Sequence, residues 1–381
     1  MDPSFWAAAA SLTAAPLARL VDSINDLVAA TAPGARATLL VADYRHDTLV
    51  PAVGDGEDVP VDDGPAGRSY VDQRPQQERR AGSTVVWLPV TTHGDRLGVL
   101  AIELPGSAPT TALDLTVGEA LAAITARALR AAVPVSDGYL IARRVRALTV
   151  AAEMQWALLP GNSFADEHVV VAGQLEPAYA ASGDAYDWCR SPGDLFVAVF
   201  DAPGRGVDAA TYTALAVNAF RNARRGEVDL AQMVSLTDQA LYGYAGGSRQ
   251  LPAVFLRIDL TDGGGQAIYA GSPVVLRRRG GDVAHIELDP QLPLGMFQDS
   301  VYTAEPIDVR PGDRLLVVTD GAHGTQADGN PALTFDALTS LMHVTADQPP
   351  WELTRELIRQ AMQTIGRDLD QDIAAVALDL R

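Results

Sequence analysis

The chain has no lysine, a single cysteine and few aromatic residues. All 29 basic residues are therefore arginine, which we attribute to genome composition rather than to mechanism. Cys189 is the only cysteine, which excludes an intramolecular disulfide and a metal site built from clustered cysteines. No run of roughly 18 uninterrupted apolar residues occurs, so we expect no membrane-spanning helix. The N-terminus also lacks the basic cluster of a signal peptide, and we expect a cytoplasmic protein.

Acidic residues are abundant. The sequence has 48 Asp and Glu residues against 29 Arg, a net charge of −19, which argues against nucleic acid or an anionic membrane as the main partner. Hydrophobic residues make up 48% of the chain, so a disordered protein is not expected. The length of 381 residues predicts two or three domains.

A repeated pattern places an aspartate at the end of a buried strand. Twice, a Pro-Gly-Asp turn precedes an apolar run, and a second aspartate follows the first by 7 positions; the two pairs are Asp194 with Asp201, and Asp313 with Asp320. Such a turn before β-branched and aromatic residues predicts a strand start. An acid at the far end of a buried strand costs free energy unless it is paired, hydrogen-bonded or bound to metal. Chance similarity between two ordinary turns explains the repeat about as well.

A first domain is predicted over residues 16–134, after an N-terminal segment of residues 1–15. Apolar periodicity and turn residues predict helices over 18–30 and 112–132, a short helix between Gly64 and Pro75, and strands over 37–43, 48–53, 83–90 and 97–104. This order predicts an antiparallel sheet flanked by helices.

The same region resembles a GAF domain, a small sensory module. The resemblance is carried by Gly64-Pro65-Ala66-Gly67-Arg68-Ser69-Tyr70 and by Leu97-Gly98-Val99-Leu100-Ala101-Ile102. It implies a regulatory domain that either binds an unknown small ligand or serves dimerisation. His46 and His93 are expected in loops rather than as ligands.

Residues 135–160 are predicted to form a linker, with a helix over 140–159 that Pro160 ends. Its apolar residues follow a 4-3-4 spacing that suits either a dimer seam or packing on its own domain; they are Ile141, Val145, Leu148 and Ala152. A solvated face is expected for Arg143, Arg144 and Arg146.

From residue 161 onward, strands joined by glycine-rich turns alternate with pairs of helices. Helices are predicted over 208–225, 230–242, 335–342 and 351–365, hairpin turns at 262–265 and 280–282, and a last strand over 373–380. Because strand groups and helix pairs occur without a regular βαβ alternation, the fold class is α+β, with two sheets sandwiched between helices.

Six short motifs occur in order in this half. They are Gln155-Trp156-Ala157-Leu158-Leu159-Pro160, Ser182-Gly183-Asp184-Ala185-Tyr186-Asp187, Asp201-Ala202-Pro203-Gly204-Arg205-Gly206, Tyr269-Ala270-Gly271-Ser272-Pro273, Leu292-Pro293-Leu294-Gly295 and Thr319-Asp320-Gly321. Over residues 150–381 they resemble the metal-dependent serine/threonine phosphatases of the protein phosphatase 2C superfamily, in the SpoIIE/RsbU-like branch. The resemblance implies an α-β-β-α phosphatase sandwich over residues 161–381.

The residue types suit this chemistry, because two Mn²⁺ or Mg²⁺ ions held by oxygen ligands can neutralise a phosphate monoester and activate water. By the resemblance, Asp201 is the carboxylate that bridges the metals and Ala202 offers its main-chain carbonyl. Asp184 and Asp320 are the further catalytic metal ligands that the resemblance implies. Asp184 could instead cap a turn, and Asp187 is expected to do so.

Three positions depart from the family pattern. The family ends with an Asp-Asp pair whose first member is a ligand, and register places Gln371 there and Asp372 second. An amide brings no negative charge, so this metal site is expected to be weaker unless Asp370 or Asp372 moves into place. Ser272 replaces a common histidine. Arg205 replaces a histidine or lysine, and it binds either phosphate or a nearby acid.

The resulting hypothesis is a Mn²⁺- or Mg²⁺-dependent phosphoserine/phosphothreonine protein phosphatase, a homodimer regulated by its GAF-like domain through the linker helix. By resemblance, its substrate is a phosphorylated STAS-type anti-anti-sigma protein in a partner-switching pathway, and the opposing kinase is a separate protein. One alternative is a degenerate phosphatase fold that binds a partner without turnover. Another is a GAF-led dimeric sensor whose C-terminal half only transmits, which the three retained carboxylates argue against.

Overall fold

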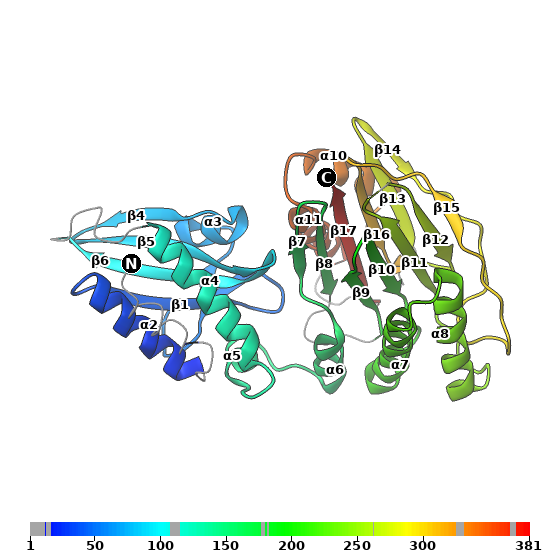
Figure 1. The fold of residues 1–381 in the computed structure, drawn as a ribbon, viewed down its shortest axis with the longest axis horizontal. Coiled ribbons are helices and arrows are strands. Elements are labelled where there is room, and N and C mark those ends of the chain that lie inside the picture. The colour runs from blue at the N-terminus through cyan, green and yellow to red at the C-terminus, as the bar shows by residue number, and fades with distance from the viewer. Residues whose placement is uncertain are drawn as a thin grey trace. The chain divides into compact units, whose positions relative to one another are not determined.

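A computed structural model describes residue 12 and residues 17–106, 115–176, 180, 183–261, 263–324, 331–365 and 371–381. The chain divides into two compact units, Met1–Ala147 and Leu148–Arg381 (Figure 1). Ser182, Asp262 and Asp370, which the sequence interpretation used, lie outside the described residues, as does nearly all of residues 1–15.

The N-terminal unit is built on one antiparallel sheet. Its six strands lie in the order β3-β2-β1-β6-β5-β4, with bounds β1 Arg36–Ala42, β2 Thr48–Pro51, β3 Val59–Pro60, β4 Gln76–Arg80, β5 Ser83–Thr92 and β6 Asp95–Pro105. The helices are α2 Leu17–Thr31, α3 Gly64–Asp72, α4 Leu115–Ala132 and α5 Gly138–Ala142. The sheet flanked by helices is confirmed; β3 and β4 were not predicted, because both are short or polar and lack an apolar alternation.

The core of this unit lies between the sheet and two helices. Helices α2 and α4 contact one another and lie across the same side of the sheet (Figure 1). Their buried residues, among them Leu20, Ile24, Leu121 and Leu129, pack with Leu39, Leu88 and Leu100 of the strands. The apolar residues whose periodicity predicted these two helices are therefore the residues that the helices bury against the sheet.

The predicted linker helix over 140–159 is wrong. The chain forms α5, then a non-helical segment, then α6 (Val150–Leu158). Thr149 begins α6 as its N-cap, since its hydroxyl accepts from the backbone N–H of Ala152 at 3.2 Å. The four apolar residues therefore do not form one helical stripe, and their exposed fractions differ widely, from 61% for Ile141 to 0% for Ala152.

Arg143 corrects a second expectation, that this arginine is solvated. It is 7% exposed, and its guanidinium donates to the carbonyls of Ala42 at 3.0 Å and Asp43 at 3.3 Å. It also stacks over the rings of Tyr44 and Tyr139, at 4.3 and 5.5 Å. These contacts fasten the end of α5 to the end of β1.

The C-terminal unit contains two antiparallel sheets. A five-stranded sheet has the order β15-β12-β11-β10-β9, with bounds β9 Ala185–Arg190, β10 Asp194–Phe200, β11 Ala253–Asp259, β12 Gly265–Tyr269 and β15 Glu305–Ile307. A six-stranded sheet has the order β14-β13-β16-β17-β8-β7, with bounds β7 Ser163–Ala165, β8 Val169–Glu176, β13 Val274–Arg279, β14 Asp282–His285, β16 Arg314–Val318 and β17 Ile373–Leu380.

Helices cover the outer face of each sheet (Figure 1). They are α7 Gly206–Arg225 and α8 Leu230–Ala245 on the five-stranded sheet, α10 Phe335–Val344 and α11 Pro350–Ile365 on the six-stranded sheet, and the short α9 Asp320–His323. Between the sheets, Val197 and Val199 of β10 pack with Val317 of β16 and Val376 of β17. The predicted α-β-β-α sandwich is confirmed.

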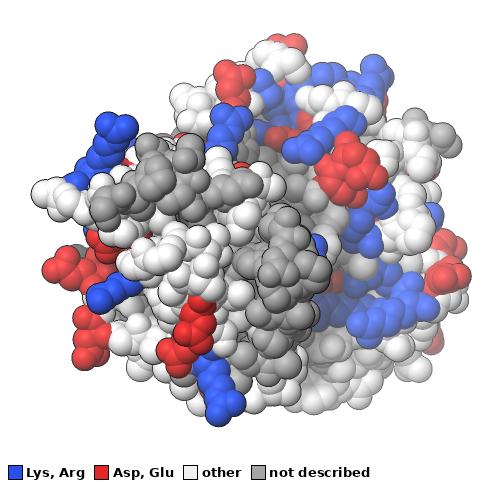
Figure 2. Space-filling model, turned by 60° about the vertical axis from the view of Figure 1, so that its left-hand side comes forward, with Lys and Arg blue, Asp and Glu red and all other residues white. Residues whose placement is uncertain are grey.

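Charged side chains of both signs are interspersed on the surface. The face in Figure 2 shows arginines lying among Asp and Glu residues. In the part of the chain that the structure describes, no helix is long and apolar enough to cross a membrane.

Candidate metal and phosphate site

The two repeated strands bring their terminal aspartates together, although they belong to different sheets. Asp201 follows β10, and Asp320 begins α9 directly after β16 and Thr319. The carboxyl group and the backbone N–H of Asp320 both lie close enough to the Asp201 carboxylate to change its acidity. The sandwich therefore converts a repeat in sequence into a pair of neighbouring acids.

Burial and this neighbouring charge change the acidity of Asp201. Desolvation and the charge of Asp320 raise the pKa of the Asp201 carboxyl to about 6. Ser272, held at a positive φ of 51°, donates from its hydroxyl to Oδ2 of Asp201, which lowers the pKa in part. Ser272, which stands where the resemblance led us to expect a histidine, is thus a direct hydrogen-bond partner of Asp201.

Asp184 is the most deeply buried acid of the group. It lies just before β9 and is 4% exposed, and the Gln155 side chain donates to its backbone carbonyl at 2.7 Å. Burial first, then the charges of Asp201 and Asp372, raise its pKa well above the ordinary value. Its Oδ2 atom is buried and has no hydrogen-bond partner among the described residues.

Asp372, rather than Gln371, lies among these acids. Asp372 is 5% exposed, accepts from the backbone N–H of Gly183 at 2.9 Å, and its charge contributes to the raised pKa of Asp184. Gln371 is exposed. Gly321 packs against the Asp372 backbone so closely that a β-carbon would collide with its carbonyl oxygen, which explains the glycine of the Thr-Asp-Gly motif.

Ala202 and Arg205 lie on the loop between Asp201 and α7. Ala202 is 6% exposed, and a β-carbon at Gly183 would lie 2.5 Å from the Ala202 carbonyl oxygen, so Gly183 allows the two backbones to approach. Arg205 is exposed at the N-cap of α7, with an extended backbone and no side-chain capping bond.

Asp187 does not cap a turn, contrary to expectation. It lies within β9, 1% exposed, and binds Arg221 at 2.6 and 3.0 Å and Arg224 at 2.8 Å. Both arginines belong to α7, so this acid fixes the helix that follows the Asp201 loop. Sequence reasoning missed it because its partners lie 34 and 37 positions away.

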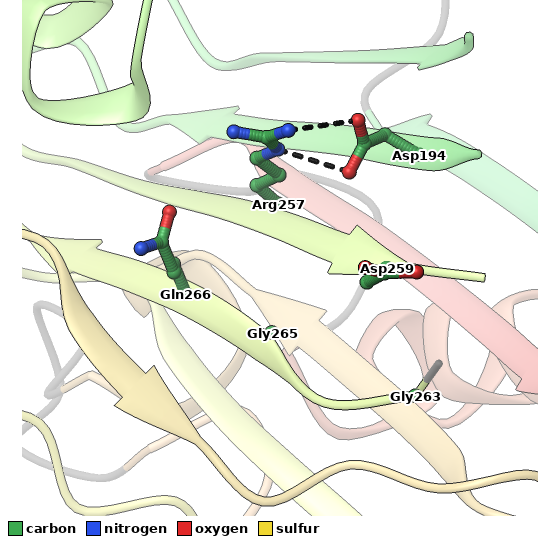
Figure 3. Close-up of a pocket in the computed structure, with 6 residues that line it drawn as sticks. All are labelled: Asp194, Arg257, Asp259, Gly263, Gly265 and Gln266. Carbon is green, nitrogen blue, oxygen red and sulfur yellow. Dashed lines mark hydrogen bonds and ion pairs between the residues drawn. The ribbon is translucent and has the colours of Figure 1, made fainter. Parts of the chain in front are cut away.

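The turn aspartates at the other ends of the repeated strands are paired with arginine. Arg257 of β11 binds Asp194 through two bonds of 2.9 and 3.0 Å (Figure 3). Arg279 of β13 likewise binds Asp313 through two bonds of 2.8 Å. The Asp194 pair borders an open pocket of about 300 Å³ with Gln266, at the opposite end of β10 from Asp201 (Figure 3).

The acids suit a hard divalent cation by their chemistry. Carboxylate and carbonyl oxygens are the ligands that Mg²⁺ and Mn²⁺ prefer, and the unpartnered Oδ2 of Asp184 offers one such donor. Among the described residues, no group of three or more His, Cys, Asp or Glu side chains is arranged so that it could hold a metal ion. In this structure one oxygen of Asp201 instead accepts from the Ser272 hydroxyl.

Comparisons with known proteins agree with this architecture. The PP2C domain of SiaA from Pseudomonas aeruginosa superposes with a TM-score of 0.51 at 20% identity, covering 61% of this chain and 94% of that one. This similarity shows that the C-terminal unit has a PP2C-like phosphatase fold.

Two further solved structures are similar at lower scores. The RsbU and RsbW domains of a Mycobacterium tuberculosis protein give a TM-score of 0.49 at 19% identity, covering 58% of this chain and 63% of that chain. The SpoIIE phosphatase domain with a regulatory fragment from Bacillus subtilis gives 0.48 at 17%, covering 56% of this chain and 65% of that chain. The similarity thus covers less than two thirds of the length of each of these two solved chains.

The Stage II sporulation protein E (SpoIIE) family matches residues 191–381. The chain belongs to this family. No curated protein sequence matches it. The family match begins within the C-terminal unit, so the GAF-like assignment of the N-terminal sheet domain remains a prediction.

Proposed function

We propose that the C-terminal unit is a Mn²⁺- or Mg²⁺-dependent phosphoserine/phosphothreonine protein phosphatase. The observation that carries the proposal is the buried Oδ2 of Asp184, which has no partner among the described residues and lies in a group of acids with Asp201, Asp320 and Asp372. Buried carboxylates without cations are costly, and a bound cation relieves that cost.

The ions would be held by the carboxylates of Asp184, Asp201 and Asp320. The Ala202 carbonyl would be a further donor, and Asp372 is a weaker candidate for the same role. A bound ion supplies positive charge that stabilises phosphoryl oxygens and makes nearby water more acidic. The protein contributes rigidity, because Asp201 and Asp320 are fixed by strand ends and Asp187 fixes α7. Arg205 offers a guanidinium that can bind phosphate oxygens in pairs.

The family assignment supports a more specific role. We infer that the substrate is a phosphorylated STAS-domain anti-anti-sigma protein in a partner-switching pathway, and that the N-terminal GAF-like domain regulates turnover in a homodimer through the segment that contains α5 and α6. Family membership alone suggests this substrate. Turnover of a phosphorylated STAS protein against an unrelated phosphoprotein tests it, and equal rates would remove the assignment.

A second candidate is a phosphatase fold that binds a partner without turnover. It is favoured by the exposed, neutral Gln371, where the family pattern expects a carboxylate ligand, and by the Ser272 hydroxyl that already binds Asp201. In this case the acids would be a remnant of an active ancestor.

Hydrolysis of p-nitrophenyl phosphate during a Mn²⁺ titration separates the two candidates. We expect Mn²⁺-dependent turnover in the unaltered chain and a loss of more than roughly 100-fold in Asp201→Asn. Asp282→Asn is the matched control, since Asp282 is exposed in the β13–β14 hairpin where Asn is well tolerated. A folded protein with no turnover at any Mn²⁺ concentration would favour the binding protein.

A further inference from the structure

Arg249 lies beside the loop that carries Asp201, and its position is fixed by several contacts. Its guanidinium stacks over the Tyr212 ring at 4.7 Å, and Nη1 donates to the Asp208 carbonyl in the first turn of α7 at 3.3 Å. A β-carbon built at Gly204, within the Asp201-Ala202-Pro203-Gly204-Arg205 loop, would lie 3.9 Å from Nη2. The guanidinium therefore borders the loop of the proposed catalytic site.

The backbone around Arg249 is equally constrained. The Tyr212 hydroxyl donates to the Arg249 carbonyl at 3.1 Å, and Leu251 pairs with Leu294 through two backbone bonds of 2.9 and 3.0 Å. Gly295, at φ 80°, lies so close to the Tyr212 hydroxyl that a side chain there would collide with it. The Leu-Pro-Leu-Gly motif thus helps to hold the arginine in place.

A buried acid anchors the same motif on α8, which lies beside α7 (Figure 1). Asp238 is fully buried, and one of its oxygens accepts from the Gly295 backbone N–H at 2.7 Å and from the Tyr302 hydroxyl at 3.0 Å. Arg249 is therefore held directly by Tyr212 and Asp208 of α7, and α8 acts on it only through the segment that contains Gly295. Such preorganisation lowers the entropy that a side chain loses on binding a ligand.

Among the described residues, no carboxylate forms an ion pair with Arg249, although Asp208 is nearby. Most other arginines of this unit, including Arg221, Arg257 and Arg279, bind acids. Exposed apolar side chains flank the site, because Val207 is 48% exposed and Tyr244, 60% exposed, lies 6.3 Å from the Tyr212 ring. Arginine with aromatic neighbours is typical of residues that dominate protein interfaces.

We propose that Arg249 binds an anionic group of the phosphoprotein substrate and determines substrate preference; this rests on the proposed function. The bound group is an oxyanion, either the phosphoryl group itself or a carboxylate beside the phosphorylated residue. A planar guanidinium binds both in the same two-bond geometry.

The test compares three substrates in Arg249→Met, which keeps an unbranched apolar side chain over Tyr212. The substrates are p-nitrophenyl phosphate and two phosphoserine peptides that differ only in acidic or alanine flanking residues. We expect KM for the acidic peptide to rise roughly tenfold, with a smaller change in kcat, because a charge-assisted contact is lost. Arg249→Lys should recover part of this loss.

Arg225→Met is the matched control, since Arg225 is exposed at the opposite end of α7 and its removal changes the net charge equally. A loss confined to the acidic peptide assigns the contact to the flanking carboxylate, and an equal loss on all three substrates assigns it to the phosphoryl group. KM values equal to those of Arg225→Met for every substrate would overturn the proposal.

A measurement of peptide binding separates the Arg249 proposal from the proposal that the C-terminal unit is a phosphatase. Fluorescence anisotropy with a phosphonate analogue of the acidic peptide, in the presence of Mn²⁺, reports on Arg249 without turnover. If the unaltered chain hydrolyses nothing but Arg249→Met still weakens peptide binding about tenfold, the phosphatase proposal fails and the Arg249 contact stands. Equal binding by Arg249→Met and Arg225→Met would reject the contact.

Discussion

The two ends of strands β10 and β16 use the same residue type in opposite ways. At their start, Asp194 and Asp313 bind Arg257 and Arg279 through paired hydrogen bonds. At their end, Asp201 and Asp320 contact one another, and no described arginine or histidine forms an ion pair with either. The acids at the strand starts are each neutralised by an arginine, whereas buried acids that lie together without a cation cost free energy that a bound cation would relieve.

Burial alone does not explain this difference. Asp313 and Asp184 are 1% and 4% exposed, so both are shielded from water. Asp313 accepts from Arg279 and from the Arg310 backbone N–H, but Asp184 retains an oxygen without a partner among the described residues. An unpartnered oxygen is not unique to the candidate site, because Oδ2 of the structural acid Asp238 also lacks a partner among the described residues. What distinguishes Asp184 is that the charges of Asp201, Asp372 and Asp320 act on it as well.

Removing the charge of Asp184 should have the largest effect on activity. Asp184→Asn should lower Mn²⁺-dependent turnover by roughly 100-fold or more, since it removes a proposed metal ligand. The same substitution should leave the metal-free protein at least as stable, because a buried carboxylate without a cation is lost. Paired turnover assays and urea unfolding curves check both; strong destabilisation with retained turnover would make Asp184 a structural acid.

The corresponding substitution of Asp313, at the start of β16, should lower stability and leave turnover intact, the opposite of what we expect for Asp184→Asn. Asp313→Asn should destabilise the protein, because the buried side chain at this position loses its two charged bonds to Arg279, while Arg279 keeps Asp308 as a second carboxylate partner. The metal dependence of turnover should remain. A loss in urea unfolding free energy below about 0.5 kcal/mol would place this pair with ordinary surface ion pairs.

The smallest effect should appear in the pH dependence of stability without metal. Because the pKa of Asp201 is raised to about 6 in the folded chain and lies near 3.9 when unfolded, the folded state binds more protons between these values. The stability contributed by protonated Asp201 is present at low pH and is lost as pH rises through about 6.

Urea unfolding at pH 5 and pH 7 measures this effect. Relative to Asp201→Asn, the metal-free unaltered chain should gain on the order of 1 kcal/mol at the lower pH. Saturating Mn²⁺ should reverse the trend, because metal competes with protons for the carboxylates. A pH-independent difference between the two proteins would mean that Asp201 has an ordinary acidity.

Hydrophobic periodicity within single segments was sufficient to predict most helices and strands. The last strand was predicted over 373–380 and is Ile373–Leu380, and the helix predicted over 351–365 is Pro350–Ile365. Both have strong apolar periodicity within one segment. The linker failed because the Thr149 cap and the Arg143 contacts outweigh a stripe of four apolar residues.

The site was predicted less completely than the fold. Asp184, Asp201 and Asp320 were identified from motifs and do come together, although their role as metal ligands stays a prediction. The register that favoured Gln371 did not reveal that Asp372 is the buried acid. Ser272 was noted only as a departure, since nothing near it in sequence indicates a contact with Asp201 across 71 positions.

The sequence by itself determined the sandwich of sheets and helices, the two Pro-Gly-Asp strands and the acids that follow them by 7 positions. These depend on hydrophobic periodicity and turn chemistry, which act over a few neighbouring residues. Only the tertiary structure decided which acids have arginine partners and where Arg249 lies. Those contacts join residues far apart in the chain, and the packing of the two sheets and their helices brings them together.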